Sequence, residues 1–202
     1  MRTTAILVSG VLWLGVSFVG FWRLFKYEST PGASASRVNT LPTSGEIPRS
    51  GGKAALVLFA HPHCPCTRTT IGELEQLMAA CDGRISASVF FFKPRGFPKN
   101  WEKTDLWFGA AAIHGVNVYT DLDGQEAQRL GAETSGQVFL FDKDGKQVFG
   151  GGITAGRGHA GESEGRSAIV NWVNSNSRIL SQTPVFGCSL TGPTVDDRGN
   201  KK

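Results

Sequence analysis

The densest group of reactive side chains in the sequence is the six-residue segment 61–66, His-Pro-His-Cys-Pro-Cys. It directly follows a short apolar run, and the exit from a strand into a helix is where α/β folds place ligands. Pro65 suits the first helical turn, because its missing N–H would have no partner there. Cys64 then lies near the N-cap, where helix N–H groups and a neighbouring His⁺ favour a thiolate. We therefore expect Cys64 to act as a nucleophile in thiol–disulfide exchange.

Two other cysteines are candidates for the thiol that resolves a mixed disulfide on Cys64. Cys66 is the nearest in sequence, and one intervening residue makes a small disulfide ring. We expect that ring to be strained, and strained disulfides are the more oxidising ones, which suits an oxidant or isomerase. Cys188 lies in a Phe-Gly-Cys segment of an otherwise polar stretch, which suggests that this segment docks on the domain. The sequence leaves both candidates open.

A second interpretation of the same residues is a metal site. His61, His63, Cys64 and Cys66 are four N/S ligands within six residues, and Cys188 would be a fifth. Thiolate and imidazole ligands together suit Cu(I) or Zn(II), so a copper- or zinc-binding module is the alternative function. Two packed cysteines in a domain that only docks a partner are the third interpretation.

The elements that must position these residues alternate between strand and helix, followed by a hairpin and a closing helix. This order predicts an α/β sandwich with a central sheet, and right-handed crossovers restrict its topology. The Asp-Gly turn at 144–145 marks the hairpin. Predicted strands are 54–59, 85–92, 116–120, 137–141 and 146–149, and predicted helices are 66–80, 105–114, 126–130 and 164–180.

The N-terminal stretch Thr3–Trp22 has 20 residues and no charge. A helix of that length spans about 30 Å, enough to cross a bilayer core. We expect a transmembrane anchor at 1–27, a flexible Ser/Thr/Gly/Pro-rich linker at 28–52, the folded domain at 53–190 and a polar tail at 191–202. A cleaved signal peptide ending near 33–35 is the alternative.

Charge gives weaker information about location and partners. The basic residues after the apolar stretch outnumber Arg2, which favours a cytoplasmic location for the domain. A short N-terminal tail instead favours a domain on the extracytoplasmic (periplasmic) side, and this is the orientation that we expect. The net charge is +4 and the pI is about 9.0, with basic residues scattered along the chain. No basic run is interleaved with aromatic residues, so no nucleic-acid partner is expected.

Three segments resemble the thioredoxin-like superfamily, especially its membrane-anchored TlpA-type and peroxiredoxin branch. They are 59–66, 118–124 and 138–145, and the Gly-Gly-Ile-Thr at 151–154 adds a narrower likeness to bacterial RedB-type proteins. The resemblance covers about 53–180. It implies a thioredoxin-like fold and a thiol–disulfide oxidoreductase that exchanges with a protein thiol or disulfide and needs no cofactor.

The resemblance also assigns roles and shows two departures. In that arrangement the loop after the last strand approaches the active-site helix, which implies that Arg157 and His159 face Cys64 and stabilise a thiolate or move a proton. His63, adjacent to Cys64, and His61 are candidates for stabilising the thiolate because of their places in the sequence. A glycine-rich surface loop with no such role is the alternative. The family usually has two residues between its cysteines, and its cis-proline position is occupied here by Ser135-Gly136.

Overall fold

The computed structural model describes residues 2–35, 38, 40–41, 47–48, 52–175 and 180–190. It divides into two compact units, residues 1–30 and 31–202. The first unit is helix α1, Arg2–Ser29. Within the described residues, one helix is long and apolar enough to cross a membrane, the stretch Ile6–Ser29 of α1. Both a membrane anchor and a signal sequence meet this description.

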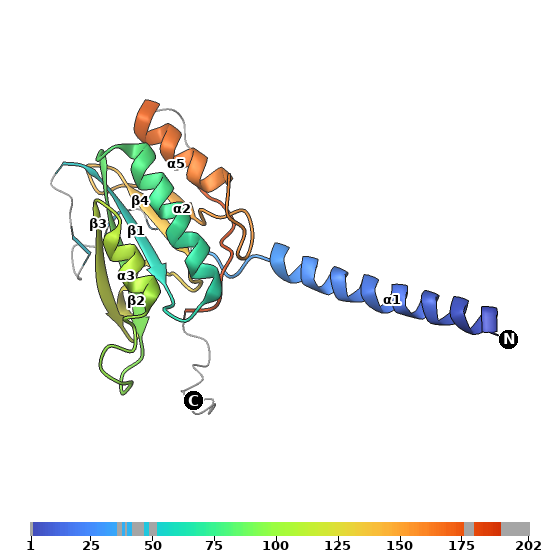
Figure 1. Ribbon diagram of the computed structural model, residues 1–202. Helices are drawn as coiled ribbons and strands as arrows, with labels where there is room; N and C mark the ends of the chain where they lie inside the picture. The colour runs from blue at the N-terminus through green and yellow to red at the C-terminus, as the bar shows by residue number, and fades with distance from the viewer. Residues whose placement is uncertain are drawn as a thin grey trace. The chain divides into compact units, whose positions relative to one another are not determined.

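The second unit is built on a five-stranded mixed sheet with the order β3-β2-β1-β4-β5 (Figure 1). The strands β1, β2 and β3 run parallel to one another, and β4 and β5 run antiparallel to β1 and β4, respectively. Their bounds are β1 Ala54–Ala60, β2 Ile85–Lys93, β3 Val116–Leu122, β4 Gln137–Phe141 and β5 Gln147–Gly151.

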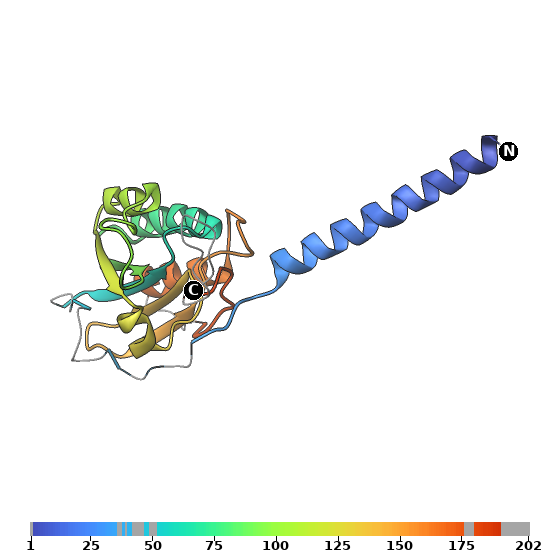
Figure 2. The same cartoon turned by 90° about the horizontal axis from the view of Figure 1, so that it is seen from below.

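Helices cover both faces of this sheet (Figures 1 and 2). Three of them, α2 (Pro65–Cys81), α3 (Asp105–Ala112) and α5 (Glu164–Ser175), contribute to the core cluster on one face. The short helix α4, Gln125–Leu130, contributes to the cluster on the other. Parallel strands linked by helices and then a hairpin agree with the α/β sandwich expected from the sequence.

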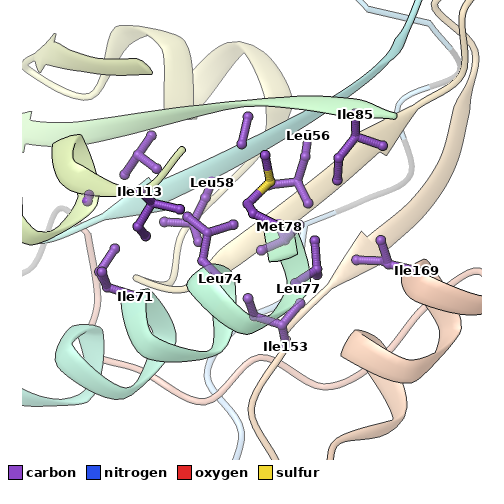
Figure 3. Close-up of a cluster of buried hydrophobic side chains, with 14 of the residues drawn as sticks. Leu56, Leu58, Ile71, Leu74, Leu77, Met78, Ile85, Ile113, Ile153 and Ile169 are labelled. Atoms are coloured by element: carbon purple, nitrogen blue, oxygen red, sulfur yellow. The ribbon is translucent and has the colours of Figure 1, made fainter. Parts of the chain in front are cut away.

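The central strand β1 shows how the sequence separates the two clusters. Successive side chains of a strand point to opposite faces. Leu56 and Leu58 therefore pack with α2, as Figure 3 shows, whereas Val57 and Phe59 pack in the cluster of α4. All four are buried, as expected for an apolar run covered on both faces.

The predicted elements are all present, with differences at their ends. Strand β5 continues through Gly150 and Gly151, which pair with β4. Helix α3 ends at Ala112, because Ile113 has extended backbone angles (φ −73°, ψ 127°). Helix α5 ends at Ser175 rather than Leu180; residues 176–179 lie outside the described part, and Leu180 is not helical. The predicted polar tail, 191–202, also lies outside it.

The segment expected to be a flexible linker makes specific contacts where the structure describes it. Ala35, Leu41 and Ile47 are buried in the cluster of α4. The Gln137 and Gln147 side chains accept hydrogen bonds from the Ala35 and Val38 N–H groups. Composition predicted a tether because large apolar residues are few in this segment. Three apolar side chains spaced along it are nevertheless enough to pack into the core of the domain.

We predict that Leu41→Ala lowers the free energy of unfolding by about 2–3 kcal/mol, since it leaves a cavity in that cluster. Leu41 is 4% exposed. The matched control is Leu180→Ala, at a leucine that is 49% exposed, where a change within about 0.5 kcal/mol is expected. Urea unfolding of the full chain in detergent measures both. Equal effects of the two substitutions would contradict the burial of Leu41 in the cluster of α4.

Candidate active site: a three-cysteine cluster at the start of α2

The turn between β1 and α2 places Cys64 at the N-cap of the helix. Its backbone is extended (φ −85°, ψ 120°), and Pro65 follows in the first turn. The Cys64 N–H donates to the His61 carbonyl at 3.2 Å, and the Thr67 N–H donates to the Cys64 carbonyl at 3.0 Å. These bonds close the turn and direct the first N–H groups of α2 toward the position that Cys64 occupies.

The residues that precede β4 hold this turn from the side. The Ser135 hydroxyl accepts the His61 N–H at 2.8 Å and lies 2.8 Å from the Thr67 hydroxyl. Gly136, at φ +94°, donates its N–H to the Phe59 carbonyl at the end of β1. This φ lies in the left-handed region that favours glycine. The pair Ser135-Gly136 thus ties the β4 entrance to the Cys64 turn.

Residues 180–190, here called the strap and coloured orange-red in Figure 1, carry Cys188 to the same place. The Ser135 N–H donates to the Cys188 carbonyl, and the Leu190 N–H donates to the Glu133 carbonyl, both at 2.8 Å. An antiparallel bridge joins Thr134 to Ser189. As a result the Sγ atoms of Cys64 and Cys188, which are 124 residues apart in the chain, lie 2.8 Å apart.

Gly187 makes this close approach possible. A Cβ on Gly187 would lie 1.9 Å from the Ser135 carbonyl oxygen, so another residue type there would push the strap away. The Arg157 guanidinium donates to the Gly187 carbonyl. Arg157 thereby connects the loop after β5 to the strap, beside the cysteines.

The environment favours the thiolate of Cys64. Its pKa falls from an ordinary value of 9.0 to about 5. The main cause is the hydrogen bond that the Cys188 thiol donates, since an ionised Cys64 only accepts; burial opposes it. The N–H groups of Cys188, Cys66 and Thr67 add to the lowering. A hydrogen bond to the charged form stabilises that form.

The other two cysteines of the cluster stay protonated. Burial, followed by the charge of Cys64, raises the pKa of Cys66, and Arg157 partly offsets this. The hydrogen bond to Cys64, followed by burial, raises the pKa of Cys188. The arrangement is one thiolate between two thiols with a guanidinium nearby. Cys81, the last residue of α2, is buried in the core cluster that α2, α3 and α5 share, and burial raises its pKa to about 11.

The two histidines belong to an aromatic group beside the cysteines. The His61 ring stacks on Phe92 at 5.8 Å between centroids, and the His63 ring lies 4.5 Å from that of Trp101. The His63 N–H donates to His61 Nδ1 at 3.2 Å. Burial, then the charge of His63, lowers the pKa of His61 to about 4. His61 is therefore neutral at physiological pH and supplies no positive charge to the thiolate.

The loop between β5 and α5 is anchored by a buried acid that the sequence analysis missed. Glu73 of α2 is 1% exposed; its carboxylate accepts the Gly161 N–H at 2.7 Å and pairs with Arg166 of α5 at 2.8 Å. This loop carries Arg157, which reaches the strap, and His159, which is exposed. The sequence did contain a signal: Glu73 precedes Leu74, on the side of the helix expected to be buried. A buried carboxylate requires a positively charged or hydrogen-bonding partner.

The predicted metal set does not converge. Among the residues that the structure describes, no group of three or more His, Cys, Asp or Glu side chains is arranged to hold a metal ion. His61 and His63 point into the aromatic group, whereas Cys64 and Cys66 lie with Cys188 and Arg157. In the part of the chain that the structure describes, Cys64 and Cys66 thus gather with Cys188 rather than with the two histidines.

Comparison with solved structures identifies the fold of the chain. No protein-family model matches the chain, and no curated protein matches it. A hypothetical protein of Sinorhizobium meliloti is 19% identical with a TM-score of 0.58, covering 80% of this chain and 94% of its own. An uncharacterized conserved protein of Geobacillus kaustophilus is 17% identical at the same TM-score, covering 80% and 92%. Both alignments cover most of each chain, so the similarity extends over the whole sheet with its strand order β3-β2-β1-β4-β5. The fold is thioredoxin-like.

A third solved structure is less similar. It is a secreted disulfide oxidoreductase of Mycobacterium tuberculosis homologous to E. coli DsbE, 15% identical, with a TM-score of 0.43, covering 60% of this chain and 81% of its own. In the present chain, the hydrogen bond between Ser135 and Cys188 holds the strap beside the start of α2, where the sequence predicted the site.

We predict that the ultraviolet absorbance of the thiolate in the reduced full chain rises as the pH increases through about 5. The Cys64 thiol is protonated below this pH and ionised above it, since its pKa is lowered to about 5. Cys64→Ser removes this step. Cys188→Ala moves the midpoint to higher pH, because it removes the thiol that donates the main hydrogen bond to the thiolate. Cys81→Ala, in the core, leaves the midpoint unchanged; a step that persists in Cys64→Ser would contradict the assignment.

We predict that Gly187→Ala raises the pKa of Cys64. The added Cβ cannot lie 1.9 Å from the Ser135 carbonyl, so the strap must move and take the Cys188 thiol with it. Gly72→Ala on α2 is the matched control, because a Cβ there meets nothing within 4 Å. The same absorbance titration reads both variants, and an unchanged midpoint in Gly187→Ala would show that the strap does not set the pKa.

Proposed function

We propose that this protein is a thiol–disulfide oxidoreductase whose redox couple is Cys64 and Cys188. The observation that carries the proposal is the 2.8 Å separation of their Sγ atoms, with Cys64 as the thiolate. A disulfide requires about 2.05 Å between sulfurs, so closing the bond needs a movement of less than about 1 Å. Oxidation of the pair, one thiolate and one thiol, gives two electrons and one proton to a partner disulfide, which takes a second proton from water and becomes two thiols.

Cys188 is favoured over Cys66 as the partner of Cys64 by the geometry of the helix start. Positions i and i+2 on a helix do not face each other, so a Cys64–Cys66 bond would distort the first turn of α2. Cys188 comes from a separate segment and approaches Cys64 from outside the helix. Cys66 remains a second thiol within the cluster, next to Arg157.

The setting follows from the N-terminal unit and the resemblance of the sequence. We take α1 as an anchor that places the domain on the extracytoplasmic, periplasmic side of a bacterial membrane, where disulfides persist. The partner is a protein thiol or disulfide. Arg157 and His159 remain candidates for stabilising or protonating a sulfur. The finer relation to TlpA-type or RedB-type proteins rests on the cysteine segment and on Gly-Gly-Ile-Thr.

The test is disulfide mapping by mass spectrometry on the full chain in detergent, with the turnover of a peptide dithiol, that is, its conversion to a disulfide by the oxidised chain, measured on the same samples. We expect oxidation to form a Cys64–Cys188 bond that is absent after reduction. Turnover should fall to background in Cys64→Ser and in Cys188→Ser, because each lacks one half of the couple. Cys66→Ser should still form the bond.

Cys81→Ala is the control for a cysteine outside the cluster, and it should retain turnover. A mapped Cys64–Cys66 bond, with Cys188 still alkylatable, would transfer the resolving role to Cys66. Oxidised samples without any disulfide at Cys64 would refute the oxidoreductase itself.

A further inference from the structure

The three sulfurs of the cluster differ in how far solvent reaches them. Cys64 and Cys66 are buried, with 2% and 8% of their surface exposed, whereas Cys188 is only half-buried. Pro184 and Ser189, the strap residues on either side of 185–188, are exposed. A partner protein approaching this site therefore meets the strap and Cys188 before it meets Cys64.

The position of the strap explains the burial of Cys64. The Cys188 N–H and the Cys188 thiol both point to the Cys64 sulfur, and the N–H groups of Cys66 and Thr67 approach it from the helix. The pairing with 133–135 and the Arg157 bond to the Gly187 carbonyl hold the strap in place. A folded partner cannot bring its own sulfur in line with Cys64 while the strap is there.

We infer that Cys188, and not Cys64, is the cysteine that forms the mixed disulfide with the partner, and that the partner is a reduced protein dithiol. The inference rests on the proposed Cys64–Cys188 couple. The chain then acts as a disulfide donor: electrons flow from the partner dithiol to the Cys64–Cys188 disulfide.

The chemistry balances without a further reactant. A partner thiolate attacks Sγ of Cys188; a new bond forms between these sulfurs, the Cys64–Cys188 bond breaks, and Cys64 leaves as a thiolate. The second partner thiolate then attacks the partner sulfur of the mixed disulfide and expels Cys188, which takes up a proton. The partner leaves as a disulfide, and the chain is left with two reduced cysteines.

The leaving group supports this direction. Exchange is faster when the sulfur that leaves is stabilised as a thiolate. In the mixed disulfide Cys188 has no S–H to donate, but the N–H groups of Cys188, Cys66 and Thr67 still approach the Cys64 sulfur and stabilise its negative charge. Stabilising the reduced form also makes a disulfide a stronger oxidant. Access and leaving-group chemistry thus select the same sulfur.

The experiment uses the oxidised full chain carrying Cys66→Ser, so that Cys66 cannot move the label. Its Cys64–Cys188 bond is first verified by mass spectrometry. A peptide with a single cysteine is added at neutral pH, the reaction is quenched with acid, and the labelled cysteine is mapped. We expect the peptide on Cys188 with Cys64 free, in at least tenfold excess over the reverse product. The same protein unfolded in guanidinium is the control, and there the two products should approach equal amounts.

Peptide found mainly on Cys64 of the folded chain would overturn the inference and leave the Cys64–Cys188 couple standing. An equally strong preference for Cys188 in the unfolded chain would also overturn it, because the fold would then not select the sulfur. Failure to form the Cys64–Cys188 bond in the first step refutes the proposed function itself, so the two failures are distinguishable.

Discussion

The pairing of the strap with residues 133–135 is the constraint on which the rest of the site depends. Two backbone hydrogen bonds and one antiparallel bridge bring a sulfur from the end of the domain to the N-cap of its first helix. The Cys64 and Cys188 sulfurs then lie 2.8 Å apart, and the Cys188 thiol donates to Cys64 when Cys64 is ionised. This neighbour lowers the pKa of Cys64, and the strap that carries it also covers Cys64.

The same contacts give the two ends of the domain a shared role. The N-terminal side contributes Gly32, whose N–H donates to the Val185 carbonyl, and Ala33, whose carbonyl accepts from the Thr134 hydroxyl. The residues after α1 and the strap therefore both pack around 134–136, the position where the resembled family has its cis-proline. Here Ser135 and Gly136 are occupied by bonds to the strap and to β1.

Much of the fold was predictable because its signals are local. The apolar run of β1, the stripe of Ile71, Leu74 and Leu77, and the Asp-Gly turn each depend on residues close together in the sequence. The chemistry at the start of α2 was predictable for the same reason, since Pro65 and the strand end place Cys64 at an N-cap. The role of Glu73 was missed, because its partners Gly161 and Arg166 are about 90 residues away.

The sequence by itself determined that a cysteine begins a helix after a buried strand, and that an apolar helix long enough for a bilayer precedes the domain. Only the tertiary structure decided which groups surround that cysteine. The histidines adjacent to it in sequence turn to Phe92 and Trp101, and the distant Cys188 and Arg157 come to the cluster instead. The reason is that backbone pairing and side-chain packing act on distances in space, and neighbours in a tight turn point in different directions.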